Sequence, residues 1–141
     1  MIVSNTHKRL ALKTRVVRKI SQIPPEDWNK VYPDVLESYD FHRTLDDAGL
    51  DQFSLFYIMV YDRKAPIAAT ACFIMNYPLD TSINGPLRRV TNSIRRALPN
   101  IFSLKAVICG MPMGQGRIGI AGDADMIVKV ISRRMEQIAK K

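Results

Sequence analysis

Two apolar stretches decide the fold: FSLFYIMVY at 53–61 and IAATACFIMNY at 67–77. Each has the length and the content of aromatic and β-branched residues that are typical of a buried strand. The short polar segment between them, at 62–66, contains Pro66 and supplies a turn. The sequence therefore predicts an antiparallel hairpin.

Helix and strand patterns alternate around this hairpin. Pro24 and Pro25, followed by two acids, favour the start of a helix, because proline fits its first turn and acids complement its dipole. The last segment has apolar residues at helical spacing behind Asp123, a plausible N-cap. We expect an α+β fold with a mixed or antiparallel sheet and flanking helices, in one domain at 14–141 behind a flexible basic arm at 1–13. The other expected elements are a strand at 14–23, helices at 24–32 and 34–49, a helix at 87–98, a strand at 101–109 and a helix at 123–141.

The composition is that of one globular domain. The 141 residues are 47% hydrophobic and 24% charged, which argues against a disordered or collagen-like chain. Two cysteines are too few for a disulfide scaffold, and no apolar run is long enough for a membrane helix. The N-terminus is basic but lacks the apolar core of a secretory signal, so we expect a cytoplasmic protein, with a mitochondrial presequence as the alternative.

The charge of the chain is uneven. The net charge is +8, and an acidic segment at 26–62 separates two basic ones at 1–25 and 63–141. Such a field attracts anions, so nucleic acid, acidic lipid headgroups and nucleotide phosphates are all candidate partners.

A glycine-rich loop lies between the last expected strand and the last helix. Residues 114–119 read Gly-x-Gly-x-x-Gly, with Arg117 inside the motif. Glycines let a backbone approach a phosphate, and free amides at a helix start attract an anion. A dinucleotide site is not favoured, because no second strand with an acid follows. A phosphate cradle and a plain loop whose glycines serve turns both remain open.

The expected helix at 87–98 supplies the alternative function. Its four arginines are Arg88, Arg89, Arg95 and Arg96, and they suit phosphate, lipid headgroups or nucleic acid as well as a solvated helix face. The alternative is thus a non-catalytic basic module that binds nucleic acid or an acidic membrane.

Few other residues carry a chemical signal. Cys109, at the end of a strand, could act as a nucleophile, but both cysteines lie in apolar runs and are expected to be buried thiols. His42 could act as a base or have a structural role. Three acids, Asp46, Asp47 and Asp51, lack the spacing of a metal loop, and no metal is expected. Three methionines, Met111, Met113 and Met126, bracket the glycine loop and could line an acyl channel or fill gaps.

The chain resembles the N-terminal half of a GNAT-like acyltransferase, in particular the FemAB-like branch. The likeness is carried by ISQIPPEDW at 20–28, by the hairpin at 53–77, and by the segment from Leu98-Pro99 through VICGMP at 107–112 into the glycine-rich turn and helix. It implies a domain that binds acyl-CoA, or a related acyl donor such as aminoacyl-tRNA, through the strand-loop-helix at 105–126 and transfers the acyl group to an amine acceptor.

The resemblance also implies which residues would hold the donor. Carried onto this sequence, the role falls on Cys109, Gly110, Met113, Gly114, Gln115, Gly116, Arg117 and Gly119. Backbone amides would stabilise the oxyanion, and a general base would deprotonate the amine, although no residue is identified as that base. The closing strands of such a fold are missing, so a homodimer in which each chain completes the sheet of the other is a further expectation.

Overall fold

The computed structural model describes residues 11–32, 35–50, 53–78, 93, 103–111, 113–114 and 116–140. The helix expected at 87–98, with its four arginines, lies outside the described residues apart from Ser93. The described elements, in chain order, are β1 (Leu12–Val17), the 3-10 turn η1 (Ile20–Gln22), α1 (Pro25–Val31), the 3-10 turn η2 (Val35–Glu37), α2 (Tyr39–Ala48), β2 (Ser54–Asp62), β3 (Ala65–Pro78), β4 (Ser103–Cys109), β5 (Ile118–Ile120) and α4 (Ala124–Ala139).

The strands form one antiparallel sheet in the order β1-β2-β3-β4, and β5 also pairs with β3. The hairpin predicted from the two apolar stretches is confirmed as β2 and β3, which turn at Arg63 and Lys64. Arg63 has a positive φ of 56°, a conformation suited to a tight turn. The α+β class is therefore confirmed, and every described strand pairing is antiparallel.

Two strands share one edge of β3. β4 pairs with Cys72–Pro78, and β5 pairs with the neighbouring stretch at 68–70. Between them the chain makes an excursion at 110–117 before it returns to the same edge. The sequence predicted an unbroken glycine-rich turn from β4 to the last helix, and this was wrong because Ile118 and Ile120 bring a short strand into the ladder. The predicted homodimer remains a prediction.

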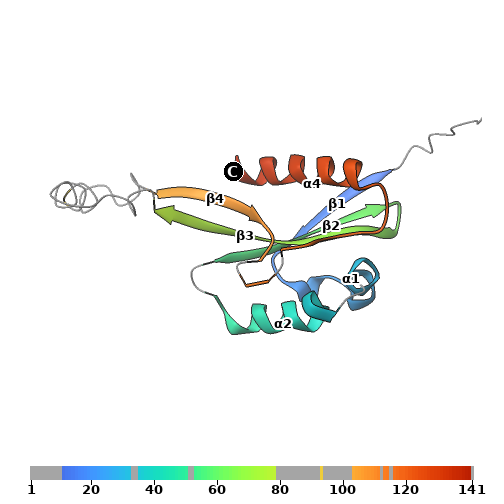
Figure 1. Ribbon diagram of the computed structural model, residues 1–141, viewed down its shortest axis with the longest axis horizontal. Coiled ribbons are helices and arrows are strands. Elements are labelled where there is room, and N and C mark those ends of the chain that lie inside the picture. The colour runs from blue at the N-terminus through green and yellow to red at the C-terminus, as the bar shows by residue number, and fades with distance from the viewer. Residues whose placement is uncertain are drawn as a thin grey trace, which may run out of the picture.

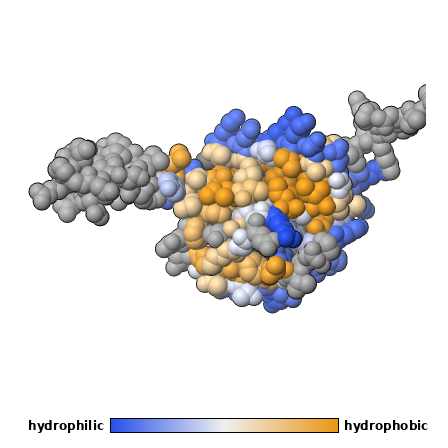
Figure 2. Space-filling view, in the orientation of Figure 1, coloured by the Kyte–Doolittle hydropathy of each residue, from blue (hydrophilic) through white to orange (hydrophobic). Residues whose placement is uncertain are grey.

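Helices cover both faces of the sheet (Figure 1). α1 and α2 lie on one face and α4 lies on the other, so the protein has three layers. In Figure 2 hydrophilic residues cover the outer side of α4, while apolar residues gather on the visible side below it. No helix in the described part of the chain is long and apolar enough to cross a membrane.

The sheet separates two hydrophobic cores. The core under α1 and α2 is rich in aromatic residues, whereas the core under α4 is mostly aliphatic. Alternation along the strands assigns side chains to the two cores, so Tyr57 and Met59 face α1 while Phe56 and Ile58 face α4.

Several predicted boundaries shift. The strand expected at 14–23 begins earlier, at Leu12, and ends at Val17, so Leu12 and Lys13 belong to β1 rather than to the arm. The helix expected at 34–49 divides into η2 and α2. Ser38 accepts a hydrogen bond from the amide of Phe41 and thereby starts α2, as the N-cap rule requires. Asp123 caps α4 as predicted.

Candidate functional site

The two ends of the glycine loop at 110–117 lie in contact with each other, at Gly110 and Gly116. The amide of Gly110 donates to the carbonyl of Ala71 at 2.8 Å and so stays in the ladder. A Cβ on Gly110 would lie 2.9 Å from the Cα of Gly116, and the two glycines have φ of 110° and 62°. Both conformations favour glycine, and the close contact excludes a side chain. Gly110 and Gly116 are thus needed for the conformation of the backbone and for the close contact between the two ends of the loop.

The loop already holds an anionic group from the protein itself. The amide of Gly116 donates to Oε1 of Glu37 at 3.0 Å. Glu37 comes from η2 and is buried, and a Cβ on Gly114 would lie 2.9 Å from the same carboxylate oxygen. The amide of Gly116, which we expected from the sequence to bind a phosphate, therefore donates to a carboxylate of the protein itself.

Gly119 lies in β5 opposite Ala69, directly under α1. A Cβ there would approach the carbonyl oxygen of Val31 to 2.6 Å and the ring of Tyr32 to 2.8 Å. The hydroxyl of Tyr32 donates to the carbonyl of Arg117. The third glycine of the motif is thus needed for the close approach of a strand to a helix.

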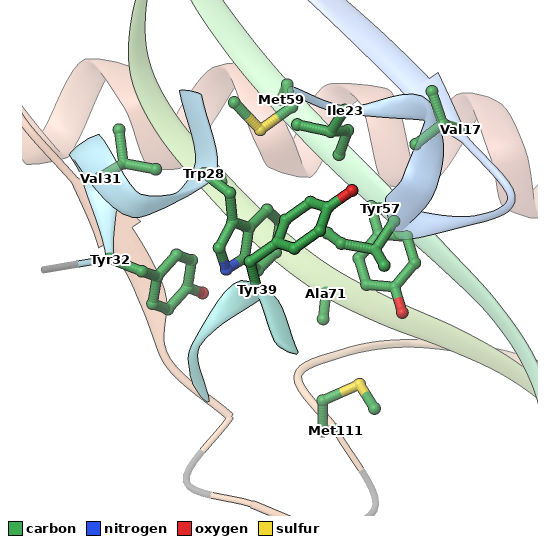
Figure 3. Packing of buried hydrophobic residues seen from close by; sticks show 12 residues of the cluster. Val17, Ile23, Trp28, Val31, Tyr32, Tyr39, Tyr57, Met59, Ala71 and Met111 are labelled. Carbon is green, nitrogen blue, oxygen red and sulfur yellow. The ribbon is translucent and has the colours of Figure 1, made fainter. Parts of the chain in front are cut away.

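The other predicted donor-binding residues that the structure describes have different surroundings. The side chains of Met113 and Arg117 are exposed, and Gln115 lies outside the described residues. Cys109 is half-buried on the opposite side of the sheet, against the α4 core. Met111 belongs to the aromatic core and lies at its margin, below Ala71 in Figure 3, and Met126 is half-buried in α4.

His42 is a core residue. It is buried between the rings of Trp28, Phe41 and Tyr57, with centroid separations of 4.8 to 5.5 Å. Neither ring nitrogen has a hydrogen-bond partner among the described residues. Burial lowers the pKa of His42 from its usual 6.5 to about 4, so the ring is neutral at physiological pH. This placement agrees with a structural role for His42, which was one of the two alternatives from the sequence.

One of the three acids near His42, Asp46, has a structural role. The carboxylate of Asp46 accepts from the hydroxyl of Tyr57 at 2.9 Å and from the amide of Ile20 at 2.6 Å. Asp47 is exposed, and Asp51 lies outside the described residues. No cluster of three or more metal-ligating side chains occurs in the described ranges.

A cavity of about 340 Å³ lies on the other face of the sheet, beneath the C-terminal half of α4. Its apolar lining comes from the three strands β1, β2 and β3 and from α4. The residues that line it are Val16 of β1, Arg18, Phe56 of β2, Ile74 of β3, Lys105 of β4, and Arg134 and Ile138 of α4. We call this cavity the basic pocket.

The basic pocket combines three cationic side chains with an apolar wall. Among the described residues, its lining contains Arg18, Lys105 and Arg134 and no acid. Nη1 of Arg134 donates to the side chain of Gln137 at 2.8 Å, while its buried Nε has no partner among the described residues. Three cations gathered around one cavity create a positive potential, which a bound anion would relieve.

Sequence reasoning missed the basic pocket because its residues come from five separate segments. One signal was present: Arg134 and Ile138 are four residues apart and therefore share a face of α4. The register that brings Lys105 and Arg18 to the same face depends on strand pairings that no local pattern specifies.

No protein-family model matches the chain, and neither a curated protein nor a solved structure matches it. The resemblance to GNAT-like acyltransferases therefore stays a prediction. The assignment of a site depends on the geometry of the loop and of the basic pocket.

Proposed function

We propose that this protein binds an anionic amphiphile of the acyl-CoA class in the basic pocket, as the donor-binding domain of an acyl transfer to an amine. The observation that carries the proposal is a cavity whose described lining combines three bases with four apolar side chains and has no acid. A ligand with an apolar arm and a phosphate or carboxylate matches both parts of this lining.

The apolar part of the basic pocket suits an acyl chain or a pantetheine arm. Phe56 is buried and forms the floor, while Val16 and Ile74 flank it on neighbouring strands. Burial of an alkyl chain contributes about 0.8 kcal/mol for each methylene group. A cavity of about 340 Å³ is at the lower end of the range for small-molecule sites, so it suits one arm of the donor with the remainder outside.

The charged part suits the phosphates of the donor. Lys105 and Arg18 are exposed at the rim, where their side chains can turn toward a ligand. Arg134 is partly buried, and its guanidinium can form two parallel hydrogen bonds with a phosphate or carboxylate. Lys105 also lies in the segment at 105–126 that the resemblance assigned to donor binding.

The proposal moves the donor from the glycine loop to the opposite face of the sheet. The amides of Gly110 and Gly116 have internal partners, so the loop offers them to no ligand. In the proposed reaction an amine attacks the thioester carbonyl and the thiol of CoA departs, while a base accepts the amine proton. The described residues around the basic pocket include no acid or histidine that would be this base.

Isothermal titration with octanoyl-CoA tests the proposal. Separate titrations with CoA and with octanoate measure the contributions of the CoA moiety and of the acyl chain. We expect octanoyl-CoA to bind more tightly than either fragment, and to raise the melting temperature because a ligand of the native state stabilises it. Absence of heat and of a melting shift at millimolar octanoyl-CoA would contradict donor binding.

A matched pair of variants locates the site. Lys105→Gln/Arg134→Gln removes two charges from the basic pocket, and Lys129→Gln/Arg133→Gln removes two from exposed positions of α4 outside its lining. We expect the first pair to weaken octanoyl-CoA binding at least tenfold and the second to weaken it only slightly. Equal effects, or binding of random RNA that both pairs reduce equally, would favour the alternative of a non-specific basic module.

A further inference from the structure

The structure holds two cysteines face to face across the β3–β4 ladder. Cys72 and Cys109 are direct partners in the register of the two strands. Both side chains belong to the core under α4, so they leave the sheet on the same side. In an antiparallel sheet this is the arrangement of a cross-strand pair.

The hydrogen-bond pattern determines how close the two residues are. The next pair along the ladder is Ala71 and Gly110, whose amide donates to the carbonyl of Ala71 at 2.8 Å. Hydrogen-bonded and non-hydrogen-bonded pairs alternate, so Cys72 and Cys109 occupy a non-hydrogen-bonded pair, with Cα atoms about 4.5 Å apart. Disulfides span Cα separations of roughly 4.4 to 6.8 Å, so a bond can form without moving the strands.

The two thiols have different surroundings. Cys72 is fully buried, whereas Cys109 is half-buried and its Sγ lies 3.2 Å from the hydroxyl of Thr70. A hydrogen bond from Cys72 lowers the pKa of Cys109, and the Thr70 hydroxyl acts in the same direction. The same pairing, with burial, raises the pKa of Cys72. Cys109 is thus the thiol that reacts first, and Cys72 is placed to react second.

We propose that Cys72 and Cys109 are a reversible thiol–disulfide pair that small disulfides such as glutathione disulfide oxidise. The thiolate of Cys109 attacks one sulfur of glutathione disulfide, forms a mixed disulfide and releases one glutathione thiolate. Cys72 gives up its proton and attacks Sγ of Cys109, which releases the second glutathione. Two protein thiols and one glutathione disulfide become one protein disulfide and two glutathione thiols.

The position of the pair indicates what its oxidation would change. Cys109 is the last residue of β4, immediately before the glycine loop leaves the sheet. Oxidation would fasten β4 to β3 at this point. Cys72 is also the register partner of Phe56, a wall residue of the basic pocket, so the bond would form beside the proposed donor site. The pair itself is argued from the register and does not depend on the proposed function.

Equilibration of the full chain in glutathione redox buffers tests the pair, with intact mass and free-thiol titration as readouts. We expect both thiols to disappear together, with a mass lower by two hydrogen atoms and a melting temperature higher by about 10 °C. A chain that keeps two free thiols in glutathione disulfide alone, or that forms only an intermolecular dimer, would overturn the proposal.

Single variants separate the two roles. Cys72→Ser should trap glutathione on Cys109 as a stable mixed disulfide, because no second thiol can resolve it. Cys109→Ser should leave the buried Cys72 unmodified. Cys72→Ala repeats the first test without a polar group in the core. Modification of Cys72 in the Cys109→Ser chain at the rate seen for Cys109 would contradict the assigned order.

Discussion

The two faces of the sheet differ in the side chains that cover them, and each holds a cavity, of about 340 Å³ under α4 and about 220 Å³ beside α2. We call the face under α1 and α2 the aromatic face. Under α1 and α2, Trp28 stacks on Tyr32 at 4.8 Å and donates from Nε1 to the carbonyl of Glu37 at 3.1 Å. Aromatic residues thus gather on this face (Figure 3). Their polar groups also form hydrogen bonds there. Under α4 the side chains are mostly aliphatic, and one end opens into the basic pocket.

This difference bears on where an anionic donor would bind. The glycine loop belongs to the aromatic face, where its glycines permit close packing and Glu37 accepts from one of its amides. The cavity beside α2 has Asp46 in its lining, whereas the described lining of the basic pocket has three cations and no acid. Glycines in a motif are therefore compatible with tight packing as well as with phosphate binding, and only the surrounding contacts distinguish the two.

The largest expected effect is on the aromatic face, at Gly119. Gly119→Ala places a methyl group 2.6 Å from the carbonyl of Val31, so β5 or α1 must move. We expect the free energy of unfolding in urea to fall by about 3 kcal/mol, at the upper end of the usual range for overpacking. Gly122→Ala is the control, because its new methyl group would meet only the Ile127 side chain at 3.5 Å, and it should stay within about 1 kcal/mol of wild type. Equal stability of the two variants would contradict tight packing of β5 under α1.

The second effect depends on pH and tests whether His42 is sealed in the aromatic core. The pKa of His42 is about 4 in the folded protein and near 6.5 in the unfolded chain, so between these values the unfolded chain binds more protons. Acidification from pH 6.5 to pH 4 should therefore reduce the free energy of unfolding, by up to about 3 kcal/mol from this residue.

His42→Phe keeps a ring of similar size and removes nitrogens that have no partner among the described residues. It should therefore flatten this part of the pH profile measured by urea unfolding, with little loss of stability at pH 7. If the free energy of unfolding of the variant falls as much between pH 6.5 and pH 4 as that of wild type, other groups cause the decrease.

A smaller effect is expected where the glycine loop meets its carboxylate. Glu37→Gln keeps an oxygen that can accept from the amide of Gly116 but removes the charge that strengthens the bond. We expect a loss of about 1 kcal/mol and faster hydrogen exchange of the Gly116 amide. Glu26→Gln, at an exposed position of α1, is the control and should leave that exchange rate unchanged. Unchanged exchange in Glu37→Gln would mean that the carboxylate does not hold the loop.

The smallest effect on stability is expected in the basic pocket. Lys105 is exposed and shares the cavity with two other bases, so Lys105→Gln removes repulsion and breaks no ion pair of the lining. The free energy of unfolding should change by less than about 0.5 kcal/mol, in contrast to Gly119→Ala on the aromatic face. A large loss in thermal or urea unfolding would assign Lys105 a structural role instead of ligand binding.

The sequence predicted the elements whose signals are local. The hairpin of β2 and β3, the cap of α4 at Asp123 and the end of α2 at Gly49 follow from patterns within a few residues. The short strand β5 was missed, because its three residues include a glycine and its pairing with Ala69 is a long-range contact.

The candidate site was less predictable for the same reason. The partner of Gly116 is Glu37, 79 positions away, and no feature of the loop indicates an internal carboxylate. The basic pocket requires the register of four strands and the placement of α4 across them. Charge composition indicated an anionic partner, but it could not distinguish the two faces of the sheet.

An NMR titration of the labelled protein with octanoyl-CoA tests most directly which face binds the donor. The account predicts shifts or broadening for the methyl groups of Val16, Ile74 and Ile138 and unchanged amide signals for Gly114 and Gly116. Perturbation of those glycine amides, with the methyl signals of the basic pocket unchanged, would contradict it.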